Sequence, residues 1–151
     1  MNNKYGFTLM EILLVIAISL LLLGTTLSVF FSFSKSRAID VASERIIDTL
    51  RIARSHTLAS KDESTYGVHF ASSTITLFKG SSFSSVDPNN IVYTFPRFVE
   101  LSVIDLVGGG NDVIFQRLTG ETDEFGTTTL QLISDPTTTA TVFIRNTGLS
   151  E

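Results

Sequence analysis

The sequence predicts an α+β protein in which one long N-terminal helix packs on a small antiparallel β-sheet domain. Three observations predict this fold. Residues 12–34 form an uncharged, mostly apolar run of 23 residues, and apolar residues then recur every three or four positions. After Ser64 the pattern changes to alternation, with many β-branched residues. The length of 151 residues allows one modest domain besides the apolar segment.

The apolar run is long enough to cross a membrane, because a helix of that length extends about 34 Å and the hydrocarbon core is about 30 Å thick. A cleaved secretory signal peptide is the first alternative, since Lys4 precedes the run. Such a peptide has a shorter apolar region that ends at small residues. Here Gly24 and the two following threonines are succeeded by more apolar residues, through Phe31, so we expect an uncleaved span.

One acidic residue, Glu11, lies within the apolar sequence near its start. A carboxylate at the centre of a bilayer costs about 2.5–3.5 kcal/mol, and less near an interface, so it usually has a partner and a function. The alternative is that Glu11 lies at headgroup level without a partner. Lys35 and Arg37 follow the run while Lys4 precedes it, so the flanking charges alone do not place the N-terminus in the cytoplasm.

Beyond Ser34 the helix becomes amphipathic. Its apolar face carries Ile39, Ala42, Ile46, Leu50, Ala53 and Thr57, and its polar face carries Asp40, Glu44, Asp48, Arg51 and Ser55. No proline occurs before Pro88, so we expect one helix from about Phe7 to Ala59 or Ser60, with its outer part against a sheet. Arg45, Arg51 and Arg54 could form an anion site, but a solvated face with salt bridges is the simpler interpretation.

Alternating β-branched segments predict strands at residues 66–70, 74–79, 91–95, 98–106, 113–116, 127–133 and 140–146. Turn-forming residues separate them at 80–82, 87–90, 108–111, 119–121 and 135–136. Short loops favour antiparallel pairing. The alternate apolar residues should face the helix: Val68, Phe70, Leu130, Leu132, Val142 and Ile144. Residues 113–115 are all apolar, which predicts a strand buried on both faces.

Composition excludes several function classes. There is no cysteine and there are two histidines, which excludes thiolate zinc sites, disulfides and cysteine nucleophiles. The formal net charge is −4, and residues 66–151 hold nine acidic and four basic side chains. Sequence-independent nucleic-acid binding needs a dense basic surface, so proteins or lipids are the expected partners.

No catalytic, metal or cofactor site is expected. His56 and His69 lack a third histidine, and a structural role is the simpler interpretation. Four acidic residues lie near turns, namely Asp105, Asp112, Asp123 and Glu124, but without the regular ligand spacing of a calcium loop. We expect them to form turns and to aid solubility.

Residues 4–16, with Gly6 directly before Phe7 and with Glu11 shortly after it, resemble the processing signal of type IV pilins and type II secretion pseudopilins. The resemblance implies a type IV pilin-like fold, cleavage after Gly6 by prepilin peptidase, and methylation of the new N-terminus at Phe7. It also implies that Glu11 pairs with the Phe7 amine of a neighbouring subunit in a filament.

The same resemblance divides the chain into a leader (residues 1–6), a transmembrane and filament-core helix (7–34), an amphipathic helical half (35–60) and a β-rich globular domain (61–151). It implies a single-pass protein of the cytoplasmic (inner) membrane, with its domain on the extracytoplasmic side until it assembles. The implied partners are other pilins or pseudopilins, prepilin peptidase and the membrane.

Further motifs lie at residues 50–55, at 66–70, at 113–115 with Gly120, and at 141–144 with Gly148. Together they are similar to the GspH/FimT group of minor pseudopilins and minor pilins. This similarity implies a non-enzymatic minor subunit of a type II secretion or type IV pilus-like filament. Ser28 stands where major pilins typically carry a mid-helix proline, which also favours a minor subunit.

Three alternatives remain open. Some minor pilins of the GspH/FimT group capture DNA through a basic C-terminal tail, but here residues 145–151 hold one cation, Arg145, and end in Glu151. A membrane-tethered enzyme would need a pocket of titratable groups that the sequence does not reveal. An ordinary single-span anchor with a binding domain would make Gly6 and Glu11 coincidental.

Overall fold

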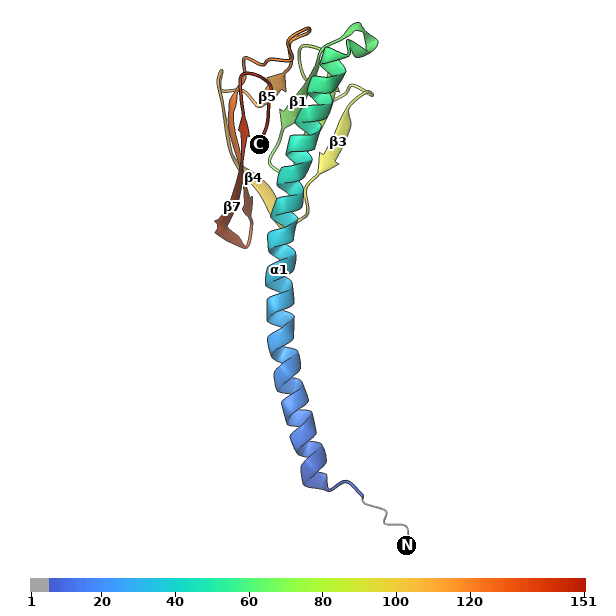
Figure 1. Cartoon of the computed structure of the whole chain (residues 1–151), viewed down its shortest axis with the longest axis vertical. Coiled ribbons are helices and arrows are strands. Elements are labelled where there is room, and N and C mark those ends of the chain that lie inside the picture. The colour runs from blue at the N-terminus through green and yellow to red at the C-terminus, as the bar shows by residue number, and fades with distance from the viewer. Residues whose placement is uncertain (1–5) are drawn as a thin grey trace. The chain divides into compact units, whose positions relative to one another are not determined.

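The structure is a computed structural model that describes the backbone of residues 6–151 and the side chains of residues 6–24 and 37–151. Helix α1 spans Leu9–Leu58, 50 residues, so the predicted helix is confirmed to within two residues at each end (Figure 1). The chain divides into two compact units between Lys35 and Ser36, which are described separately below. The predicted leader residues 1–5, including Lys4, lie outside the described residues.

The second unit contains two antiparallel sheets rather than one. The first sheet has the order β3-β2-β1-β5, with β1 Tyr66–Phe70, β2 Thr74–Lys79, β3 Ile91–Thr94 and β5 Asp112–Ile114. The second has the order β4-β6-β7, with β4 Val99–Leu106, β6 Gly126–Leu132 and β7 Asp135–Ile144. A short 3-10 helix, η1 Lys61–Glu63, connects α1 to β1.

The last strand differs most from its prediction. The turn before β7 is formed by Ile133 and Ser134, whereas the predicted turn residues Asp135 and Pro136 begin the strand. Proline is acceptable there because β7 is an edge strand and β6 bonds one side of it only. The Asp135 carboxylate accepts hydrogen bonds from the Thr137 N–H at 3.3 Å and the Thr138 hydroxyl at 2.8 Å, which orders a polar stretch that has no apolar alternation.

One hydrophobic core joins the outer part of α1 to both sheets, which gather along it in Figure 1. All six residues predicted on the apolar face of the helix are buried, as are the six predicted strand residues that should face it. A fully buried aliphatic side chain contributes about 1.5–3 kcal/mol. The burial therefore confirms the predicted packing of helix on sheet.

The outer face of the first sheet is covered by Phe83, from the segment between β2 and β3. Its ring stacks on His69 with centroids 3.8 Å apart and contacts Phe78 at 5.7 Å. Gly67 makes room for this layer, because a Cβ there would lie 2.5 Å from Phe78 Cζ. The prediction that residues 113–115 are buried on both faces was wrong in part: Val113 and Phe115 are buried, whereas Ile114 is half-buried.

Candidate functional site

The N-terminal segment holds the predicted processing residues. Gly6, Phe7 and Thr8 precede the first turn of α1, and all three are exposed. A Cβ added at Gly6 would meet no atom within 4 Å, and the backbone there is not left-handed. Neither the fold nor the local conformation therefore requires glycine at position 6.

Thr8 and Glu11 form the N-terminal cap of α1. The Glu11 backbone N–H donates to Thr8 Oγ1 at 3.2 Å, and the Ile12 N–H donates to the Thr8 carbonyl at 3.2 Å. Because α1 begins at Leu9, Thr8 occupies the cap position and Glu11 the third helical position, the spacing of a capping box. An acidic side chain in the first turn also favours the helix dipole. The capping role of Thr8 was missed, although the Thr-x-x-Glu pattern could have revealed it.

The apolar side chains described in the first unit, those of residues 6–24, are uncovered. Phe7, Leu9 and Met10 are 74–79% exposed, and the large apolar residues from Ile12 to Leu23 are 50–69% exposed. A groove of about 210 Å³ on this surface is lined by Phe7, Glu11, Ile12, Val15 and Ile16, so the Glu11 carboxylate borders an apolar hollow. A helix that is apolar on all sides is normally buried in lipid or among other helices.

Among the helical residues whose side chains are described, no stretch is long and apolar enough to cross a membrane. The predicted span continues through residues 25–34, whose side chains lie outside those described.

The structure brings three of the quoted motifs together at Arg54. Its Nε donates to the Gly120 carbonyl at 3.0 Å, which ties α1 to the turn after β5. Gly148 has φ +75°, and a Cβ there would overlap Gly120 O and lie 2.9 Å from Arg54 Nε. Arg54, Gly120 and Gly148 thus form one close-packed contact between the helix and two turns.

A polar cluster surrounds the end of α1. The Tyr66 hydroxyl donates to Asp62 Oδ2 at 2.8 Å, and Lys79 Nζ lies 3.9 Å from the same oxygen. Burial, together with Asp62, raises the pKa of Tyr66 to about 12, while the Tyr66 hydroxyl and then Lys79 lower the pKa of Asp62. Burial and then the Lys61 charge lower the pKa of His56, whose ring packs edge-on against Tyr66 at 5.0 Å.

The second histidine also has packing partners. His69 Nδ1 lies 2.5 Å from Asp112 Oδ1, which links β1 to β5, and Phe83 stacks on the ring. These contacts agree with the structural role predicted for His69.

Two of the four predicted turn carboxylates, Asp123 and Glu124, accept hydrogen bonds from residues two to ten positions away. Glu124 Oε2 accepts from the Ile114 N–H at 3.2 Å and from the Thr122 hydroxyl at 2.9 Å, and Asp123 accepts from the Gln116 amide at 2.9 Å. Within the described part of the chain, no group of three His, Asp or Glu side chains is placed to hold a metal ion.

The sequence model described as the prokaryotic N-terminal methylation motif matches residues 1–27. No curated protein and no solved structure matches the chain. The motif covers Gly6, Phe7 and Glu11 and extends into α1, the long helix of an α+β fold with antiparallel sheets. The chain therefore carries a type IV prepilin-like N-terminal methylation motif at the start of an α+β fold.

Proposed function

We propose that the chain is a minor structural subunit of a type II secretion or type IV pilus-like filament. Its function is assembly rather than catalysis. The observation that carries this proposal is the N-terminal helix, which combines the methylation motif with apolar side chains that the chain itself leaves exposed. Such a surface is stable in lipid before assembly and among the helices of neighbouring subunits afterwards.

Processing prepares this helix for assembly. Prepilin peptidase cuts between Gly6 and Phe7 and methylates the Phe7 amine. The exposure of Gly6, where the fold imposes no requirement for glycine, supports recognition of this residue by an external protein. Removal of the leader also leaves a positively charged amine next to the first turn of α1.

Glu11 then sets the register between subunits. Its carboxylate borders the apolar groove, and a carboxylate moved into an apolar filament core is stable only with a cation beside it. The Phe7 amine of a neighbouring subunit supplies that cation. Before assembly the subunit resides in the cytoplasmic (inner) membrane as a single-pass protein with its domain on the extracytoplasmic side.

Membership of the GspH/FimT group is supported by the contact at Arg54, Gly120 and Gly148. These residues belong to separate motifs of the resemblance, and their packing against one another gives a physical reason for each residue type at its position. No observation favours DNA uptake over this function, because the one cation of the C-terminal segment, Arg145, pairs with Glu151.

Replacement of Glu11 by Gln tests the assembly role. We expect the variant to be processed and retained in membranes. Its amount in filaments should fall by about tenfold or more, since removing one partner of a buried ion pair costs about 3–5 kcal/mol. Glu44→Gln, an exposed acidic position on the outer part of the same helix, is the matched control and should incorporate normally. Quantitative immunoblotting of sheared filaments measures both. Equal incorporation of the two variants would contradict the pairing of Glu11.

A further inference from the structure

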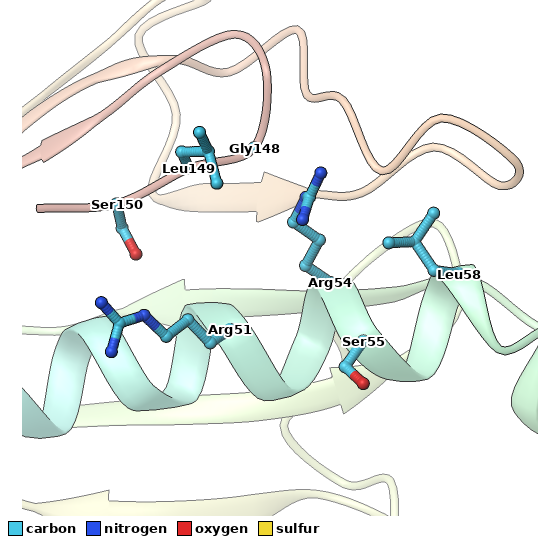
Figure 2. Close-up of a pocket in the computed structure, with 7 residues that line it drawn as sticks. All are labelled: Arg51, Arg54, Ser55, Leu58, Gly148, Leu149 and Ser150. Atoms are coloured by element: carbon cyan, nitrogen blue, oxygen red, sulfur yellow. The ribbon is translucent and has the colours of Figure 1, made fainter.

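A groove separates the outer part of α1 from the C-terminal segment of the chain. It has a volume of about 320 Å³ and is lined by Arg51, Arg54, Ser55 and Leu58 of the helix and by Gly148, Leu149 and Ser150 opposite. Figure 2 shows Arg54 extending from the helix toward the Gly148 turn and Arg51 lying along the helix below Ser150. We call this the α1–C-terminal groove.

One wall of the groove is an incomplete strand. Residues 149–151 pair with the end of β7 through three hydrogen bonds: Arg145 N–H to Leu149 O at 2.8 Å, Phe143 N–H to Glu151 O at 2.9 Å, and Glu151 N–H to Phe143 O at 3.1 Å. In an antiparallel ladder the residue between such bonds directs its own N–H and C=O to the other edge. Ser150 is that residue, and among the described residues its backbone has no hydrogen-bond partner.

Polar groups in the groove have unused bonding capacity. Ser150 Oγ is buried and has no hydrogen-bond partner among the described residues. The Arg54 side chain is fixed by its Nε bond to Gly120, and its two terminal nitrogens have no hydrogen bond in the described part of the chain. Arg51 is 66% exposed, and its contact with Asp48 is 3.7 Å long, beyond hydrogen-bonding distance.

The charged and apolar residues of the groove indicate which kind of ligand it can bind. The two arginines are the charged residues that line the groove, while residues 66–151 hold nine acidic and four basic side chains. Leu58 and Leu149, 39% and 56% exposed, provide an apolar lining beside the arginines.

We propose that the α1–C-terminal groove binds an extended peptide segment that presents a carboxylate beside an apolar side chain. The carboxylate pairs with Arg51 and Arg54, the apolar side chain contacts Leu58 and Leu149, and the peptide backbone bonds Ser150. Identifying the source as a neighbouring filament subunit rests on the proposed function.

A peptide fits these groups better than nucleic acid or lipid does. Phosphate-backbone binding relies on many cations along a surface, whereas two arginines face this groove within an acidic domain. An unpaired backbone edge and an apolar lining are the features that strand addition uses.

Fluorescence anisotropy with the full-length chain in neutral detergent tests the proposal. The probe is a labelled, capped peptide of sequence Val-Asp-Leu-Glu-Val, compared with its Val-Asn-Leu-Gln-Val analogue. We expect the acidic peptide to bind about tenfold more tightly or better, the size of effect a charge-assisted hydrogen bond gives. Arg51→Gln should weaken binding of the acidic peptide to the level of the analogue. Arg97→Gln removes an exposed cation that does not line the groove and should leave binding unchanged.

A charge exchange provides the second test. The Arg51→Glu variant should no longer bind the acidic peptide, and its affinity for Val-Lys-Leu-Lys-Val should exceed that of the wild-type chain. Absence of acidic-peptide binding, or equal binding by the Arg51 and Arg97 variants, would overturn the proposal. So would Arg51-dependent binding of single-stranded DNA or anionic phospholipid vesicles without peptide binding. Glu11→Gln should bind the peptide normally, so failure of the filament function and failure of the groove give different results.

Discussion

At the scale of single residues, glycine occurs at different positions for different reasons. Gly148 is required by the fold, because its backbone is left-handed and a Cβ would overlap Gly120 O. Gly6 is exposed, has no neighbouring atom within 4 Å of an added Cβ and no left-handed conformation. A requirement for glycine at position 6 would therefore come from another molecule, such as the peptidase.

Gly148→Ala should destabilise the domain by about 2–5 kcal/mol, since the left-handed conformation costs about 1–2 kcal/mol and overpacking adds about 1–3 kcal/mol. Gly109→Ala is the matched control, because Gly109 has φ +70° but no atom within 4 Å of an added Cβ. The Gly109→Ala variant should lose only the cost of the left-handed conformation, about 1–2 kcal/mol of the free energy of unfolding. Urea denaturation of the full-length chain in detergent measures both, and equal losses would refute the close packing at Gly148.

Tyr66 should ionise at a higher pH than an ordinary tyrosine side chain. Burial and Asp62 raise its pKa to about 12 from an ordinary value of 10. The raised pKa means that the stability contributed by neutral Tyr66 is complete below pH 10 and is lost as the pH rises toward 12. Ultraviolet titration should therefore show a late tyrosinate step, absent in Tyr66→Phe and shifted to lower pH in Asp62→Asn. A single step near pH 10 for all tyrosines would contradict this environment.

At the scale of elements, the outer part of α1 is the main support of the domain. Ile46, fully buried, contacts the core shared by both sheets, whereas Val41 on the same helix is 55% exposed. Ile46→Ala should lower the free energy of unfolding by about 2–5 kcal/mol, and Val41→Ala should lower it by less than about 1 kcal/mol. Denaturant midpoints measure this difference, and similar losses for the two variants would mean that the helix does not pack as described.

Periodicity predicted the elements well where burial repeats regularly. The apolar face of α1 and the strands at Tyr66–Phe70 and Thr74–Lys79 were all predicted from spacing, because the side chains that face the core recur in each at a fixed period. The early start of β7 was not predicted, because residues 135–139 are polar and belong to an edge strand. Within this segment Asp135 and Thr139 pair with β6, and residues 136–138 lie in a register irregularity between them.

Contacts between residues far apart in the sequence could not be predicted from the periodicity of apolar residues. The division of the strands between two sheets depends on which strands pair, and β1 pairs with β5 across more than forty residues. The stacking of Phe83 on His69 gave no periodic signal, since Phe83 lies in an irregular segment. At the candidate site, Gly6, Phe7 and Glu11 were identified from local sequence, whereas the groove between α1 and residues 148–150 required the structure.

At the scale of the whole molecule, the two units differ in how their apolar side chains are buried. Residues of the second unit form their own core, and among the side chains that the structure describes its first member is Ala38. The described side chains of the first unit are exposed and largely apolar, so this unit depends on lipid or on other subunits. This contrast supports the proposed function, in which the subunit resides in a membrane before it joins a filament.

The mass of the intact chain, extracted from membranes of cells with active prepilin peptidase, tests the account most directly. We expect residues 7–151 carrying one added methyl group. Gly6→Val should retain the leader, while Gly24→Val, at another glycine with no atom within 4 Å of an added Cβ, should be processed normally. A wild-type chain that still begins at Met1 under these conditions would contradict the central claim.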